Sequence, residues 1–355
     1  MTVEGTDMAE SSEPTAVGVV GVGSLGIRLA RQFDELDGSE LVALADVDAE
    51  GLDAAGRELS IPPADRYTDY EAMLEEAPLD AVGIATPNGL HRDQTIAALD
   101  RDLHVMCEKP LATNVEDAHE VAQHAEASDR TVMVGYQRHL NPAYEVARER
   151  WALGDNDPHF ITGEITHDWQ SYYETMENWR MDPYLSGGGH LLNVGTHVID
   201  AILWTTGLTP THVNAYVDFH DDDQIFDKQS SIIVEFDNGA VANVSDTGMV
   251  ARTREHVHIW DEEGAVYLEG REWDERFVTT IDADGTEHDP YNDYERWLSK
   301  GRAFLEAIET GDEPPATVQD GLRSVVITEA AYRSGRQNER LSLAEEYPYL
   351  DWVAE

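Results

Sequence analysis

A glycine-rich turn near the N-terminus has the residue spacing of a phosphate-binding site. Gly21-Val22-Gly23-Ser24-Leu25-Gly26 reads G-x-G-x-x-G and separates an apolar run from an amphipathic segment. Glycines permit a tight turn, and the N–H groups that open the following helix can bind a pyrophosphate. Asp46 follows the next apolar run, where a carboxylate would bind both ribose hydroxyls and repel a 2′-phosphate. We therefore predict a dinucleotide site that favours NAD over NADP, with a ligand-free glycine turn as the alternative. Its expected contacts are Gly21, Gly23, Ser24, Leu25, Gly26 and Asp46.

Polar residues also follow a later apolar run of this half. Thr86-Pro87-Asn88 ends that run, and His91 opens the next helical segment. The carboxyl ends of parallel strands form the ligand crevice of such a sheet, so these four residues are expected to line the cofactor cleft. The alternative for Asn88 and His91 is an ordinary turn and helix start.

Lys109 is a candidate for chemistry because lysine is rare here. The chain has 24 Lys and Arg residues together, and only Lys109, Lys228 and Lys300 are lysines. An ammonium is a compact donor whose pKa can fall, whereas a guanidinium keeps its proton at working pH. We expect Lys109 to position and polarise a substrate hydroxyl. The alternative is a surface lysine retained by chance.

Three polar residues recur at helical spacing in the second half. Asn193, His197 and Asp200 are expected to share one helix face. His197 titrates near neutrality, so we expect it to act as the general acid/base, with Asn193 orienting the substrate. A buried structural histidine is the alternative. With His190 the set could also bind a metal ion, but no second carboxylate-histidine motif faces it, and we predict no metal site.

Aromatic and cationic residues supply further candidate substrate contacts. Trp169, Tyr172, Tyr173 and Trp179 could stack on sugar faces, although core packing explains each equally well. Tyr136, Arg138, Trp179 and Arg180 are the additional contacts that we predict for the substrate.

The first half alternates short β-branched runs with amphipathic helical stretches, a pattern typical of a parallel sheet flanked by helices. A capping box, Thr113 with Glu116, is expected to open the last of these helices. The expected strands are 16–20, 41–45, 81–86, 104–107 and 131–134, and the expected helices are 27–36, 49–59, 70–76, 91–99 and 115–127.

Beyond residue 137 the pattern changes to longer alternating strands separated by turns, which indicates a mostly antiparallel sheet. The expected strands are 160–167, 213–219, 230–236, 240–245 and 256–260, with a helix at 189–205 and helical structure over 293–336. The fold class is therefore α/β, with a doubly wound parallel Rossmann sheet followed by an α/β domain that has a large, mostly antiparallel open sheet. We place an acidic leader at 1–14, the NAD-binding domain at 15–137 and the substrate and oligomerisation domain at 138–355.

Composition excludes several kinds of partner. The 355 residues carry a formal net charge of −47, which disfavours binding to nucleic acid or anionic membranes. A surface rich in Asp and Glu and poor in Lys is suited to high salt, where screening weakens self-repulsion. The single cysteine, Cys107, excludes an intramolecular disulfide, and no apolar run is long enough to span a membrane. We expect a protein of a high-salt cytoplasm.

Three motifs together resemble the glucose-fructose oxidoreductase / inositol dehydrogenase / MocA family. They are the glycine-rich turn, Glu108-Lys109-Pro110, and the stretch from Gly187 to Asp200 that reads GGGHLLNVGTHVID. The resemblance extends over about residues 15–340 and includes Asn178-Trp179-Arg180 and, near the end, the AAYRS segment at 330–334.

The resemblance implies an NAD-dependent oxidoreductase that moves hydride between nicotinamide and a secondary alcohol of a sugar, sugar acid or cyclitol. It places Glu108 and Lys109 at the cofactor, Lys109 also at the substrate, and His197 in the catalytic set. The family's usual Asp is replaced by Asn193, which leaves open a dehydrogenase of a nucleotide-activated hexose such as a UDP-sugar. A non-catalytic regulator that binds NAD and sugar is a further alternative. A homodimer or homotetramer formed through the second sheet is also implied.

Overall fold

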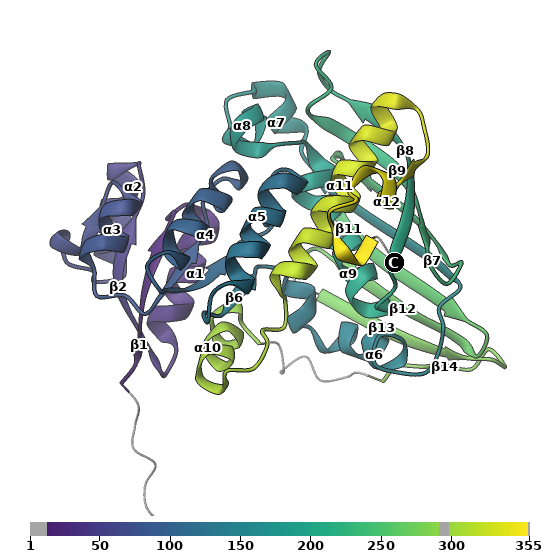
Figure 1. Ribbon diagram of the computed structural model, residues 1–355, viewed down its shortest axis with the longest axis horizontal. Coiled ribbons are helices and arrows are strands. Elements are labelled where there is room, and N and C mark those ends of the chain that lie inside the picture. Colours follow the sequence, from purple (N-terminus) through teal and green to yellow (C-terminus); the bar gives the residue numbers. More distant parts are fainter. Residues whose placement is uncertain (1–12, 274, 291–297, 354–355) are drawn as a thin grey trace, which may run out of the picture.

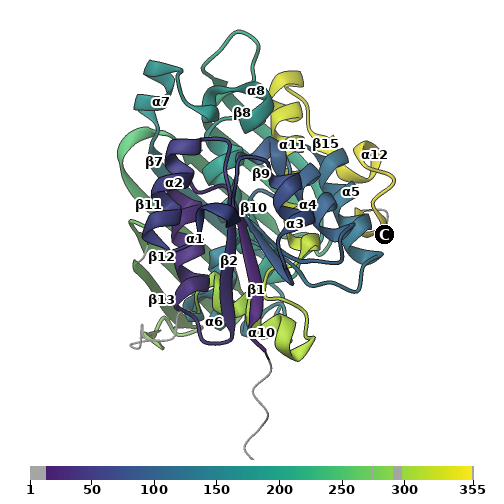
Figure 2. The same cartoon turned by 90° about the vertical axis from the view of Figure 1, so that its left-hand side faces the viewer.

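The computed structural model describes residues 13–273, 275–290 and 298–353. The first half is a parallel sheet in the order β3-β2-β1-β4-β5-β6 with helices on both faces (Figures 1 and 2). The strands are β1 (Thr15–Val20), β2 (Ser39–Ala45), β3 (Arg66–Tyr67), β4 (Ala81–Ile84), β5 (His104–Cys107) and β6 (Val132–Val134). The helices are α1 (Ser24–Glu35), α2 (Ala49–Glu58), α3 (Tyr70–Glu76), α4 (His91–Leu99) and α5 (Val115–Glu126). The predicted Rossmann sheet is confirmed, because strand order reverses between β1 and β4, where such sheets bind ligands.

The start of α5 differs from the prediction. Asn114, and not Thr113, is the N-cap: its side chain accepts a hydrogen bond from the backbone N–H of Asp117 at 2.9 Å. The helix therefore begins one residue later than a Thr113–Glu116 capping box requires. Both residues are good caps, and the tertiary position of the loop decides between them.

The second half is a sheet in the order β14-β13-β12-β11-β7-β10-β9-β8-β15, and β7 with β10 is its parallel pair. Its strands are β7 (Phe160–Asp168), β8 (Pro210–Phe219), β9 (Asp227–Phe236), β10 (Val241–Thr247), β11 (Met249–Asp261), β12 (Gly264–Arg271), β13 (Glu275–Asp282), β14 (Glu287–His288) and β15 (Leu341–Ser342). The mostly antiparallel open sheet is confirmed, whereas β12 to β15 were not predicted. Polar residues alternate through β12 and β13 and weaken their apolar signal.

Helices cover one face of this large sheet and leave the other face open (Figure 1). They are α6 (Pro142–Arg150), α9 (Thr196–Thr206), α11 (Val318–Gln337) and the short α12 (Leu343–Glu346). The short helices α7 (Gln170–Thr175) and α8 (Pro183–Ser186) lie together beyond the upper end of the sheet in Figure 1. Along β9, buried Ile232 and Val234 alternate with Ile233, which is 41% exposed. Among the described residues, no helix is long and apolar enough to cross a membrane.

Two later segments return to the first half. The long helix α11 packs between α5, α9 and β8, and α10 (Lys300–Thr310) packs on α1 (Figure 1). Part of the predicted helical region, 293–297, lies outside the described residues, as does most of the predicted leader. The position of α10 places a late part of the chain beside the first sheet.

The predicted helix at 189–205 consists of two parts. Leu191–Gly195 forms a π-helical turn, and α9 continues from Thr196. The carboxylate of Asp227 on β9 accepts hydrogen bonds from the N–H groups of Gly189 (3.0 Å) and Leu191 (2.8 Å). These bonds satisfy donors that a helix start leaves free. A strand distant in sequence thus fixes where Asn193 and His197 lie.

Candidate active site

A cleft of about 760 Å³ lies where the carboxyl ends of β1, β2, β4 and β5 face the start of α9. Residues of both halves line it. From the first half they include Gly21, Gly23, Ser24, Leu25, Arg28, Gln32, Asp46, Val47, Thr86, Pro87, Asn88, Gln94, Glu108 and Lys109. From later segments they include Gln137, His167, Trp169, Tyr172, Trp179, Arg180, Asn193, His197, Trp273 and Lys300.

The glycine-rich turn opens this cleft and suits a pyrophosphate. Gly21 has φ of +85°, and a Cβ at Gly26 would lie 1.7 Å from the Gly21 carbonyl oxygen, so the turn and the helix need glycine at both positions. Gly23 faces open space and is the N-cap of α1, which therefore has no side-chain cap. The N–H groups at the start of α1 remain available to an anion. Gly26 itself does not line the cleft; it lets α1 pack against the turn.

Asp46 lines the cleft at the end of β2. Its Oδ2 accepts a hydrogen bond from the Val22 N–H at 2.8 Å, and its Oδ1 accepts one from the Asp48 N–H at 2.9 Å. Each carboxylate oxygen has a second lone pair for a ribose hydroxyl. Val47 beside it is 91% exposed and offers an apolar surface to a ring. The residues of the first half thus fit a dinucleotide.

The loop after β4 connects the two halves. Thr86, Pro87 and Asn88 line the cleft as predicted. The Asn88 amide donates hydrogen bonds to the Ser186 carbonyl (2.9 Å) and to Asn193 Oδ1 (3.0 Å). His91 does not line the cleft, in contrast to the prediction. Its ring nitrogens lie 2.7 Å from the Pro110 carbonyl oxygen and 2.9 Å from that of Thr86, so it holds two cleft loops together.

Lys109 and Asn193 meet across the cleft. Lys109 Nζ donates a hydrogen bond to the backbone carbonyl of Asn193 at 2.9 Å. Burial lowers the pKa of Lys109 to about 7, with Lys300 and Arg180 contributing in the same direction and Glu108 opposing them. A neutral amine with a free lone pair is therefore accessible near neutral pH.

The Asn193 side chain is fully engaged by the protein. Its Nδ2 donates to Ser186 Oγ (3.1 Å), the Gly188 carbonyl (3.2 Å) and the Gly189 carbonyl (2.9 Å), and its Oδ1 accepts from Asn88. Asn193 is 6% exposed. The amide consequently anchors the glycine loop, which differs from the expected role of orienting substrate.

His197 lines the cleft but is 3% exposed. Burial holds its pKa well below the usual range, and nearby Arg138 and Lys109 lower the pKa further. Its buried Nδ1 has no hydrogen-bond partner within the described residues. The ring is edge-on to Trp273, with centroids 5.9 Å apart. His197 is thus a neutral imidazole on which a proton is poorly stabilised.

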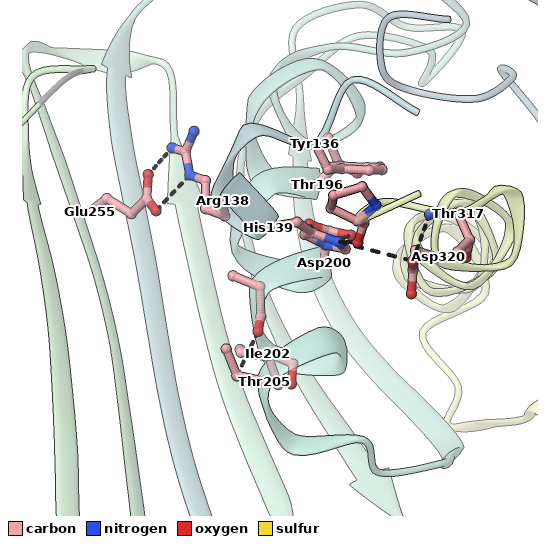
Figure 3. A network of polar contacts seen from close by, with 12 residues as sticks. Tyr136, Arg138, His139, Thr196, Asp200, Ile202, Thr205, Glu255, Thr317 and Asp320 are labelled. Atoms are coloured by element: carbon pink, nitrogen blue, oxygen red, sulfur yellow. Dashed lines mark hydrogen bonds and ion pairs between the residues drawn. The ribbon is translucent and has the colours of Figure 1, made fainter. Parts of the chain in front are cut away.

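Asp200 does not line the cleft, whereas Asn193 and His197 do. Figure 3 shows Asp200 beside His139, whose Nε2 lies 3.0 Å from Asp200 Oδ2, with Asp320 of α11 on the other side. The π-helical turn changes the angle between Asn193 and the residues of α9, whereas His197 and Asp200 both follow it within the regular helix. His190 pairs with Asp246 instead, at 2.6 Å. Among the described residues, no group of three or more His, Cys, Asp and Glu side chains could hold a metal ion.

Two predicted substrate contacts lie outside the cleft lining. The Tyr136 hydroxyl lies 2.7 Å from Thr196 Oγ1 in the core. Arg138 is 1% exposed and forms a bidentate ion pair with Glu255 of β11 (Figure 3). The sequence placed both residues near the end of β6, but it did not give the direction of their side chains. Trp179 and Arg180 do line the cleft, and the Arg180 guanidinium lies 4.3 Å from the Trp179 ring centroid.

Other lining residues were missed at the level of sequence. His167 and Trp273 come from the large sheet and its β12–β13 turn, and Gln137 follows β6. No local motif marks them. Lys300 carried a usable signal, since it is one of only three lysines.

Comparisons with known proteins agree with this architecture. Residues 15–136 match the family described as "Oxidoreductase family, NAD-binding Rossmann fold", and residues 152–267 match the "GFO/IDH/MocA C-terminal domain". The aldose-aldose oxidoreductase of Caulobacter crescentus, solved with glycerol, superposes with a TM-score of 0.81 at 25% identity, over 93% of this chain and 100% of that one. Levoglucosan dehydrogenase in complex with NADH gives a TM-score of 0.82 at 22% identity, over 93% and 99%.

Curated relatives match along nearly the whole chain. D-xylose 1-dehydrogenase (NADP(+)) 2 of Haloferax volcanii is 29% identical over 333 residues, which is 92% of this chain and 99% of the relative. Myo-inositol 2-dehydrogenase of Thermotoga maritima is 22% identical over 341 residues, or 93% and 98%. The protein belongs to the glucose-fructose oxidoreductase / inositol dehydrogenase / MocA family of NAD-binding oxidoreductases.

Proposed function

We propose that this protein is an NAD-dependent dehydrogenase of a secondary alcohol in a sugar, sugar acid or cyclitol. One observation carries the proposal: Lys109, with a pKa near 7, and neutral His197 lie in the same cleft that begins at the glycine-rich turn. Relatives named for xylose, inositol and levoglucosan support this substrate class. Arg28, Lys109, Arg180 and Lys300 also give the cleft a cationic lining that suits a dinucleotide, in a chain of net charge −47.

We assign the proton transfer to Lys109, which revises the sequence-based division of roles. Bound nicotinamide supplies the acceptor for the hydride that leaves the alcohol carbon. The hydroxyl proton passes to the Lys109 amine, whose pKa suits a general base near neutrality. His197 hydrogen-bonds the reacting alcohol as a neutral imidazole. Asn193 positions Lys109 through its backbone carbonyl.

The choice of NAD over NADP rests on Asp46. Its carboxylate lies in the cleft beside acidic Asp48, so a 2′-phosphate would face negative charge. The xylose dehydrogenase relatives are named for NADP(+), and the levoglucosan dehydrogenase structure holds NADH. Because these relatives differ in cofactor, our prediction of NAD for this chain rests on the negative charge beside the ribose site.

Assembly and location belong to the same proposal. The open face of the large sheet exposes Phe160, Tyr216 and Ile233, which are 45%, 67% and 41% exposed. We infer a homodimer or homotetramer through this face, because apolar side chains on an uncovered sheet are typical of an interface. A high-salt cytoplasm agrees with the acidic composition.

A substrate screen tests the proposed function. Free aldoses, cyclitols, sugar acids and UDP-sugars are offered with NAD or NADP in molar KCl, and NADH or NADPH formation is measured. We expect turnover with free sugars, sugar acids or cyclitols and a preference for NAD. Turnover restricted to UDP-sugars would replace the substrate class. Cofactor binding without turnover on any of these compounds would favour a regulator.

A further inference from the structure

Lys300 pairs with the carboxylate of Glu108, the residue directly before Lys109 in the sequence. Lys300 itself is almost 200 residues later. Lys300 Nζ donates a hydrogen bond to Glu108 Oε1 at 2.5 Å, and all three side chains line the cleft. The Lys300 and Glu108 side chains are 14% and 7% exposed, so this ion pair is shielded from water. At that depth the attraction between the two charges is screened less than on the surface.

The structure holds Lys300 firmly at this position. Ser299 caps α10 by accepting a hydrogen bond from the Arg302 N–H at 3.1 Å. The Gly301 N–H donates to Gln32 Oε1 at 3.0 Å, which ties the first turn of α10 to α1. Phe304 packs edge-on against Phe33, with centroids 6.3 Å apart. The first turn of α10 is therefore docked on the cofactor-binding half.

Glu108 lies close to Gly135. A Cβ at Gly135 would lie 2.7 Å from Glu108 Oε2 and 3.0 Å from the Glu108 Cα, so glycine leaves room for the Glu108 side chain. Burial would raise the pKa of Glu108, but Lys300 reverses this and Lys109 and His91 assist, so the pKa falls below its ordinary value. The carboxylate thus stays ionised beside the Lys109 amine.

The charges around Lys109 come from several elements. Glu108 precedes it on the same loop, Lys300 is on α10, Arg180 follows α7, and Arg138 follows β6. His197 of α9 and His91 of α4 are the neighbouring imidazoles. Arg138 is paired with Glu255, and Arg180 stacks on aromatic rings, so neither neutralises Glu108. Lys300 is the residue that does.

We propose that Lys300 is a positioning residue: by pairing with the Glu108 carboxylate, it weakens the stabilisation that this carboxylate would otherwise give to the protonated form of Lys109. The Lys109 amine therefore stays available as a base. The inference rests on the proposed role of Lys109 in alcohol oxidation. Without Lys300, Lys109 is the remaining lysine beside the ionised Glu108. The unpaired negative charge of Glu108 then favours the ammonium form of Lys109. Lys300 therefore acts through Glu108 and not on the substrate.

The three lysines allow a direct test without turnover. Protein labelled with ¹³C at lysine Cε gives one NMR signal for each of Lys109, Lys228 and Lys300, assigned by single substitutions. In the wild type the Lys109 signal should titrate near pH 7. In Lys300→Met it should titrate about one pH unit higher or more. The matched control is Lys228→Met, which removes the same charge from an ion pair with Asp218 elsewhere and should leave the Lys109 titration unchanged.

Enzyme kinetics provide the second readout. The acidic limb of kcat/KM for alcohol oxidation, where activity falls as Lys109 becomes protonated, should move to higher pH with the Lys109 titration in Lys300→Met. It should return toward wild type in Lys300→Arg, which keeps the charge. A stability loss with an unmoved Lys109 titration would reduce Lys300 to a structural role and overturn the proposal. A wild-type Lys109 signal that titrates near the ordinary lysine value would overturn it as well, even if Lys300→Met does not fold. If the titration moves but the kinetic limb does not, Lys109 is not the base, and the catalytic role assigned to Lys109 fails separately from the effect of Lys300 on it.

Discussion

Replacing Asn193 with Asp tests why this chain departs from the family's acidic residue. The Nδ2 group donates to the carbonyl oxygens of Gly188 and Gly189, at 3.2 and 2.9 Å, and to Ser186 Oγ. In Asn193→Asp, a carboxylate oxygen would face two carbonyl oxygens in a site that is 6% exposed. Burial and the loss of these donors should raise the folded-state pKa of the introduced carboxyl above its unfolded value of about 3.9.

The magnitude follows from linkage. If the folded-state pKa rises by about two units, the variant loses in total roughly 2.7 kcal/mol of stability relative to wild type as pH rises from about 2 to about 8. The sign is set by the raised pKa: the folded protein binds the proton more tightly, so the stability difference is smallest at low pH and grows through about pH 4 to 6. Protonated Lys109 beside the site offsets part of this loss.

Thermal or denaturant unfolding of wild type and Asn193→Asp in molar KCl, at several pH values, measures this effect. Asn193→Ala is the control, because it removes the same donors without adding a titratable group, and its stability loss should not vary in this pH range. A gap between Asn193→Asp and wild type that stays constant with pH would refute the reasoning. In the kinetics, the new charge should raise the pKa of Lys109 and His197, and move the acidic limb of kcat/KM for alcohol oxidation to higher pH.

Three further predictions concern the cofactor, the base and the surface. Asp46→Ser should lower the preference for NAD over NADP by about ten- to a hundredfold, because charged hydrogen bonds of roughly 1.5 to 3 kcal/mol are lost; equal wild-type kcat/KM values for the two cofactors would contradict the role of Asp46. Lys109→Met should lower kcat by about 10²- to 10⁴-fold while NAD still binds in a fluorescence titration, whereas an unchanged kcat in the folded variant would remove Lys109 from the chemistry. The unfolding midpoint should rise between low and molar KCl, since the net charge of −47 is screened by salt; a flat midpoint would show that self-repulsion does not limit stability.

The Rossmann half was predicted well because its signals are local. Apolar runs of four to seven residues mark β1, β2, β4 and β5, and the glycine spacing marks the turn between β1 and α1. The second half was predicted less completely. Its strands β12 and β13 carry polar residues such as Glu269 and Arg276, whose partners His258 and Glu255 are on β11. Local periodicity does not reveal a strand that depends on its neighbours for burial.

The sequence by itself determined the class of chemistry. The glycine turn, Asp46, Lys109 and His197 belong to local motifs whose residue types and spacing indicate that chemistry. Only the tertiary structure decided where the side chains point and which residues they contact. Asp200 pairs with His139 while His197, on the same helix, lines the cleft, and Arg138 pairs with Glu255. The docking of α10 brings Lys300 to Glu108. The pKa values that separate a base from a neutral hydrogen-bond partner depend on burial and on charges distant in sequence, and spacing along the chain carries neither.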